Sequence, residues 1–156
     1  ARGSERRRAV LSDVAGLTGL FLAAFGAATV LPFHSEIVFA GMQAAGAAPV
    51  ALLVVVASVG NTLGAVVNYV LGRGGERLAQ RRWFPASAAQ LARAQAIWAR
   101  WGVWTLLLSW APFGDAFTAI AGLMRTPVAL FLLLVTLAKT GRYVVLAWAT
   151  GAALGA

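Results

Sequence analysis

The chain of 156 residues has no cysteine, one histidine and only five acidic residues. The absence of cysteine excludes disulfide bonds and thiolate metal sites. One histidine and a few separated acids do not form a coordination sphere, so we expect neither a metal nor another cofactor. Charged residues make up only 12% of the chain, which excludes a water-soluble domain of ordinary composition.

The chain is instead rich in long apolar segments. Hydrophobic residues make up 60% of it, and the mean hydropathy is +0.78. No charged residue occurs over 14–35 or over 37–72, and about 20 such residues suffice to cross a bilayer as a helix. The sequence therefore predicts an all-α integral membrane protein, with a basic N-terminus over 1–13 and a single membrane domain over 14–156.

The net charge of +8 comes from arginines that flank the apolar segments rather than from a uniformly basic surface. Membrane orientation explains this pattern better than nucleic-acid binding, so we expect no nucleic acid as a partner. The positive-inside rule places both arginine clusters in the cytoplasm and the C-terminus on the outer side of the inner (plasma) membrane. The clusters are Arg2, Arg6, Arg7 and Arg8, and Arg73, Arg77, Arg81, Arg82, Arg93 and Arg100.

The central basic stretch, 73–101, ends in a predicted amphipathic helix. Ser87 and Gln90 have the spacing of a capping box. Helical spacing places Trp98 and Trp101 on one face and Arg93 on another. Tryptophan beside arginine suits the lipid interface, although a helix packed on the cytoplasmic side of the protein itself fits nearly as well.

An internal repeat organises the membrane domain. The segment PVALLVVVASVGNTLGAVV, from Pro49, aligns with PVALFLLLVTLAKTGRYVV, from Pro127, and LPF and AGM upstream of the first align with APF and AGLM upstream of the second. We therefore predict two copies, over 31–72 and 102–151, joined by the amphipathic linker 73–101. The first long helix ends at the cytoplasmic arginines and the second copy starts there, so the copies are inverted.

Inversion requires that the apolar pieces before the two long helices turn back instead of crossing. The uncharged run 101–114 has only 14 residues, which is the length of a re-entrant hairpin. We expect Pro32 in the first hairpin, and Pro112 with Gly114 in the second, to supply the breaks. Each copy is then a re-entrant hairpin, with an acid at its tip, followed by a long transmembrane helix.

Charged side chains at membrane depth predict a polar centre. Lys139 and Arg142 lie about a dozen and fifteen residues beyond the second repeat's proline, and their spacing turns them to similar faces of one helix. Buried cations need anions nearby, and Glu36 and Asp115 are the acids of the membrane segments. We expect Asp115 to neutralise Arg142, with Lys139 as the next candidate partner.

Other polar residues have less specific interpretations. Gly60 and Gly64 have the spacing of a small-residue packing face, and Asn61 and Asn68 on the polar face of the same helix are expected to act as interhelical glue. His34, in a turn close to Glu36, is read equally well as a titrating group and as an interfacial histidine.

Four segments carry a family resemblance: LPFHSEIVFAG, GNTLGAVVNYVLGR, LLLSWAPFGDAFTAIAGLMR and AKTGRYVV. They resemble the blocks of the DedA (VTT, SNARE-associated) membrane family, in particular its YqaA-like branch, over about 17–151. The resemblance implies paired re-entrant hairpins that meet within the membrane, and a role in moving lipids between leaflets. Some relatives translocate phospholipids or polyprenyl-phosphate carriers, with proton coupling proposed.

These observations lead to one functional hypothesis. The chain is expected to be a lipid transporter or scramblase that is not an enzyme. Arg142, Lys139 and Arg125 are the candidates for binding a lipid phosphate, and Glu36, Asp115 and His34 those for relaying charge or protons. The lipid is a phospholipid or a polyprenyl phosphate. Proton coupling and self-association stay open, as do two rivals: an intramembrane lipid-modifying enzyme and a non-transporting assembly factor.

Overall fold

The computed structural model describes residues 2–29, 34–82, 84, 86–111 and 114–155. All regular elements among these residues are helices, which confirms the predicted all-α class. The elements are α1 (Arg2–Ala27), α2 (Ser35–Ala44), α3 (Val50–Arg73), α4 (Glu76–Ala79), α5 (Ala88–Trp101), the 3₁₀ helix η1 (Gly102–Leu108), α6 (Gly114–Leu123) and α7 (Val128–Gly155). The predicted breaks Pro32 and Pro112 lie outside the described residues.

Helix length separates the elements into two groups. In α1, α3 and α7, segments of 25, 24 and 28 residues are long and apolar enough to cross a membrane. In contrast, α2 and α6 have ten residues each, which is about 15 Å of helix against a hydrocarbon core of about 30 Å. Neither short helix can cross a bilayer on its own.

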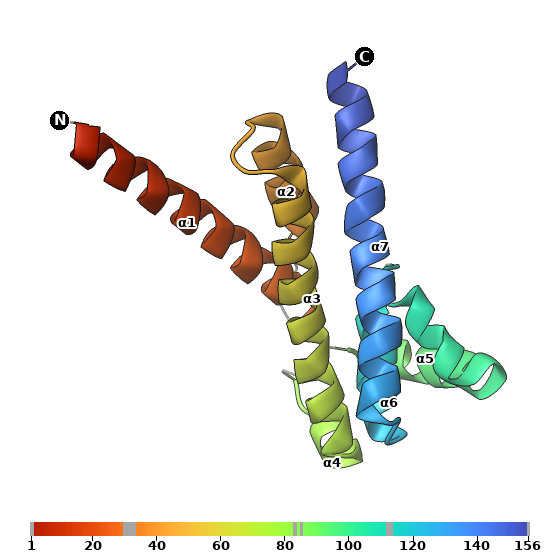
Figure 1. Ribbon diagram of the computed structural model, residues 1–156. Helices are drawn as coiled ribbons and strands as arrows, with labels where there is room; N and C mark the ends of the chain where they lie inside the picture. The colour runs from red at the N-terminus through yellow and green to blue at the C-terminus, as the bar shows by residue number, and fades with distance from the viewer. Residues whose placement is uncertain (1, 30–33, 83, 85, 112–113, 156) are drawn as a thin grey trace.

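The long helices α3 and α7, which follow α1 in the chain, lie side by side and run in opposite directions. Figure 1 shows α3 descending to α4, whereas α7 rises from the α4 end of the molecule to the C-terminus. The short helix α2 lies beside the start of α3, and α6 lies near its other end. Each short helix also contacts the long helix of the other half, α2 with α7 and α6 with α3.

Prolines begin the long helices and tight turns precede them. Pro49 is the N-cap of α3, with φ −55°, and a proline here sacrifices no intrahelical hydrogen bond. Both short helices end in a Schellman turn with a left-handed residue, Gly46 after α2 (φ 61°) and Arg125 after α6 (φ 55°). Glycine adopts this conformation readily, whereas an arginine does so at a cost.

Two glycines allow α1 to cross α3 closely. A β-carbon on Gly60 would stand 2.6 Å from the Phe21 carbonyl oxygen, and one on Gly64 would stand 2.5 Å from that of Phe25. Because the obstacle is backbone, a larger residue would force the helices apart. This arrangement confirms the small-residue packing face predicted from the sequence.

The asparagines of α3 join the same interface. Asn61 donates a hydrogen bond of 2.8 Å to the Ala24 carbonyl, and Asn68 donates one of 2.6 Å to the Ala28 carbonyl. The Asn68 amide also donates to the Thr118 hydroxyl on α6, at 3.2 Å. Both asparagines are almost completely buried, so they connect helices as the sequence predicted.

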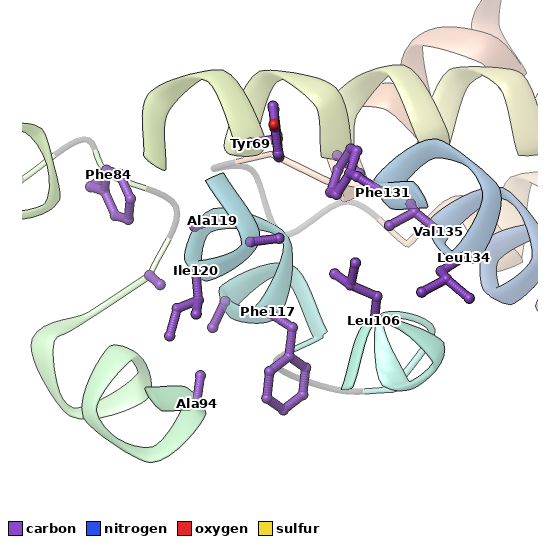
Figure 2. Close-up of a cluster of buried hydrophobic side chains, with 14 residues drawn as sticks. Tyr69, Phe84, Ala94, Leu106, Phe117, Ala119, Ile120, Phe131, Leu134 and Val135 are labelled. Carbon is purple, nitrogen blue, oxygen red and sulfur yellow. The ribbon is translucent and has the colours of Figure 1, made fainter. Parts of the chain in front are cut away.

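The larger hydrophobic core joins α3, α5, η1, α6 and α7 (Figure 2). The capping box of Ser87 and Gln90 is present at the start of α5. Ala94 is buried in this core and Trp98 packs against it, whereas Trp101 is 59% exposed. The amphipathic helix therefore packs on the protein through most of its apolar face, and leaves its last tryptophan outside.

The two chain ends lie toward the same end of the molecule, opposite α4 (Figure 1). The contacts of Gly60 with Phe21 and of Gly64 with Phe25 show that α1 and α3 run in the same general direction. This direction places the N-terminus on the same side as the C-terminus, whereas the positive-inside rule places it on the same side as the arginine-rich linker. The membrane side of each end stays a prediction.

Candidate functional site: two ion pairs on one helix

The first turn of each short helix carries an acid at its second residue. Glu36 has this position in α2 and Asp115 in α6. A carboxylate in the first turn of a helix interacts favourably with the positive end of the helix dipole. Both acids lie against the middle of α7, so that one long helix receives the beginnings of both short helices.

The deeper of the two ion pairs joins α6 to α7. The Lys139 ammonium nitrogen lies 3.2 Å from the Asp115 carboxylate, and the lysine side chain is only 2% exposed. A lysine this deeply buried would be very unfavourable without a counter-charge. The need to neutralise the buried Lys139 therefore explains why an acid, Asp115, occurs in an apolar segment.

The second ion pair joins α2 to α7. The Arg142 guanidinium contacts the Glu36 carboxylate, and both side chains are about one-third exposed. The predicted partnership of Asp115 with Arg142 is thus corrected, and Lys139 is the actual partner of Asp115. Side chains three residues apart on an α-helix point in directions about 60° apart, which is enough for Lys139 to face α6 while Arg142 faces α2.

A neutral contact beside the second ion pair fixes the start of α2 further. The Ser35 and Tyr143 hydroxyls are 2.9 Å apart and completely buried. The Phe39 ring lies over Tyr143 with centroids 5.6 Å apart. Sequence reasoning missed Ser35, although its position directly before Glu36 in a helical first turn was an available signal.

A cavity of about 570 Å³ lies next to the ion pairs, between α7 and the segment around η1. Arg142 is its charged lining residue, and the rest of the lining is almost entirely apolar. The lining residues are Leu107, Trp110, Leu137, Ala138, Gly141, Arg142 and Val145. A partly exposed guanidinium in an apolar cavity suits an amphipathic anion.

Several predicted site residues lie elsewhere. His34 is exposed just before α2, and Arg125 lies at the far end of α6 from Asp115, about 15 Å along the helix. Asn61 and Asn68 bind the backbone of α1 instead of the charged residues. Gly114 begins α6, where its Cα packs tightly on the backbone of Ser109, and its predicted role as a hairpin break stays a prediction.

Two comparisons give no match, to any family model or to any solved structure. A comparison with curated proteins does give relatives. The inner membrane protein YqaA of Escherichia coli K12 is 38% identical over 144 residues, which cover 90% of this chain and 94% of the relative. The chain belongs to the YqaA family. The inner membrane protein YqaA of Shigella flexneri matches equally well.

A more distant relative extends the YqaA family match. A protein of Haemophilus influenzae described as uncharacterized is 34% identical over 140 residues, covering 81% of this chain and 82% of the relative. The two YqaA relatives are named as inner membrane proteins, and the described residues of this chain form three helices able to cross a membrane. Composition, structure and relatives thus agree on a membrane protein with transmembrane helices.

The described residues do not bring three or more histidine, aspartate or glutamate side chains together in a group that could hold a metal ion. The chemistry available at the two ion pairs is therefore that of two cations, two carboxylates and a pair of hydroxyls. These groups can bind an anion, and can exchange partners or protons.

Proposed function

We propose that this YqaA-family protein moves a phosphate-bearing lipid between the two leaflets of the inner membrane. The observation that carries the proposal is the position of Arg142, which is paired with Glu36 and also lines an apolar cavity of about 570 Å³. The guanidinium can donate two parallel hydrogen bonds to a phosphate. The apolar lining can receive the hydrocarbon chain of the same molecule.

The two halves of the chain are further proposed to be inverted copies, each with a re-entrant hairpin, as in the DedA family. The short helices support this because they have the same length, an acid at the second position and a left-handed residue after the last turn. The opposite directions of α3 and α7 fit a two-fold axis in the membrane plane (Figure 1). In this arrangement the starts of α2 and α6 meet near mid-membrane.

The ion pairs have different roles in the proposed mechanism. Lys139 is almost fully buried, and its contact with the partly exposed Asp115 carboxylate maintains the position of α6. Arg142 is partly exposed, so an incoming phosphate can replace Glu36 as its partner. The released carboxylate then becomes a candidate to take up a proton, which would couple lipid movement to a proton gradient.

A vesicle assay tests the proposal. Purified protein is reconstituted into liposomes containing fluorescent phosphatidylglycerol or a fluorescent polyprenyl phosphate, and movement of the label between leaflets is followed with a membrane-impermeant quencher. We expect R142Q to reduce movement to the level of empty liposomes. The matched control R93Q removes an exposed arginine of α5 and should behave like the wild type.

Three results would reject the proposal or redirect it. Wild-type protein that leaves both lipids in place contradicts transport and favours an assembly factor. Equal rates for R142Q and wild type remove Arg142 from the mechanism. A chemically altered lipid, detected by thin-layer chromatography after incubation, would instead identify an intramembrane enzyme.

A further inference from the structure

The connection between α5 and α6 contains a 3₁₀ helix of unusual length. The helix η1 has seven residues, whereas runs longer than three or four are uncommon because the hydrogen-bond geometry is poor. In an α-helix, side chains three residues apart drift by about 60° per step, so four of them would spread over about half of the circumference. A 3₁₀ helix has three residues per turn, so every third side chain falls on one straight row.

Burial divides this segment into an inner and an outer side. Leu106 and Ser109, three residues apart, are 0% and 1% exposed, and Thr105 on the neighbouring row is 1% exposed. Figure 2 shows Leu106 on the side of η1 that faces Leu134 and Val135 of α7. These residues attach η1 to the core, whereas Trp104 and Leu107, again three residues apart, face outward.

The outward row is almost entirely aromatic. Trp101, the last residue of α5, is 59% exposed, Trp104 is 64% exposed, Leu107 is 38% exposed, and Trp110, just after η1, is 48% exposed. We call these four residues the aromatic row. Exposing three tryptophans side by side is unfavourable unless their faces contact lipid or another apolar partner.

The aromatic row connects two cavities. One, of about 220 Å³, is lined by Trp101, Trp104 and Leu107, together with Thr105 and Leu108. The other is the cavity of about 570 Å³ that contains Arg142. Leu107 lines both cavities, so they adjoin along the same side of η1.

A cation lies at each end of the aromatic row. The Arg100 guanidinium lies 5.7 Å from the centre of the Trp101 ring, and Arg142 lines the cavity that Trp110 also lines. The seven residues of η1 rise about 14 Å, close to half of the hydrocarbon core of about 30 Å. The row is therefore about as long as the distance from a membrane surface to its midplane.

We propose that the aromatic row is a docking track for a phospholipid, along which an anionic head moves from Arg100 to Arg142 while an acyl chain lies on Trp104, Leu107 and Trp110. The cations at the two ends select an anionic head, and the uncharged row between them suits a hydrocarbon chain. The direction of movement rests on the proposed transport function; lipid docking on the row does not.

Two measurements test the track separately. Native mass spectrometry counts the dioleoylphosphatidylglycerol molecules that stay bound to protein extracted in detergent, and the vesicle assay measures movement of the same lipid. The variants are W104A and W110A. The matched control W148A removes a tryptophan of α7 that is 74% exposed and lies outside the row.

We expect W104A and W110A each to reduce bound lipid by about fivefold, because each removes apolar contact area with the acyl chain, and to slow movement, whereas W148A changes neither. Wild-type protein that moves no lipid, but shows this binding pattern, would reject the transport function and leave the docking track in place. Equal losses in all three variants, or none in any, would overturn the track and make these tryptophans ordinary interfacial anchors.

A second copy of the chain is the competing occupant of the row. Because the chain has no cysteine, L108C, on a residue that lines the smaller cavity beside the row, provides a single reactive site in liposomes. Efficient disulfide cross-linking between two copies would overturn lipid docking and identify the row as a dimer interface. Labelling of L108C by a thiol-reactive lipid without cross-linking supports the track.

Discussion

The Lys139 ammonium nitrogen and the Asp115 carboxylate meet at 3.2 Å, between α7 and the first turn of α6, with the lysine side chain only 2% exposed. A charge pair this deep is neutral as a unit but very unfavourable if one partner is removed. Arg142 and Glu36 repeat the arrangement three residues further along α7, in a more accessible position. The two acids are about equally exposed, but Lys139 is buried and Arg142 is about one-third exposed, and this difference makes the two pairs separable by mutation.

D115N is expected to destabilise the protein by about 3 to 5 kcal/mol, because it leaves the buried Lys139 without a counter-charge. E36Q leaves a partly exposed arginine and should cost about 1 kcal/mol or less. Thermal unfolding in detergent measures both. In a double-mutant cycle, D115N should couple with K139M and be additive with R142Q. Strong coupling of Asp115 to Arg142 would contradict the pairing.

G64A should weaken the crossing of α1 and α3 because its methyl group would meet the Phe25 carbonyl oxygen at 2.5 Å. We expect a loss of about 1 to 3 kcal/mol, typical of overpacking. The control is G19A, which lies on α1 with no atom within 4 Å of the added methyl group and should stabilise the helix by up to about 1 kcal/mol. Both melting temperatures are compared with that of the wild type. Similar shifts for the two variants would show that α1 does not pack here.

R125G is expected to stabilise the end of α6, because glycine adopts a φ of 55° without the cost of a side chain, a gain of about 1 kcal/mol. R125A, which removes the charge but keeps the β-carbon, should give no such gain. Since Arg125 lies far from the ion pairs, R125G should also move lipid at the wild-type rate. A large loss of transport in R125G would show that Arg125 binds the lipid phosphate despite its distance from the ion pairs.

Single cysteines at Ala88 and Ala153 should react with an impermeant thiol reagent from opposite sides of the membrane, because α3 ends at the α4 end of the molecule and α7 runs from that end to the opposite one. A cysteine at Ala9 separates two expectations. The positive-inside rule groups it with Ala88, whereas the direction of α1 groups it with Ala153, which is the result we expect. Labelling of Ala88 and Ala153 from one side would exclude the inverted arrangement.

Much of the architecture follows from local properties of the sequence. Uncharged runs set the long helices, because backbone groups in lipid must be satisfied within the helix. The prolines before α3 and α7 and the capping box of α5 mark helix starts by local chemistry. The identity of the charged groups was also evident from the sequence, since any ionisable residue in such segments needs a partner.

The tertiary structure decided which charge meets which. Lys139 and Arg142 are near neighbours on α7, and the sequence does not reveal that Lys139 reaches the start of α6 while Arg142 reaches the start of α2. The Ser35–Tyr143 contact spans 108 residues and depends on the same packing. The aromatic row likewise depends on tertiary structure, because its residues come from α5, from η1 and from the turn after η1, which pack together on the core around Leu106. Sequence thus determined which groups had to be neutralised, and helix packing determined their partners, because side-chain pairing between helices depends on rotation and depth, which no local pattern specifies.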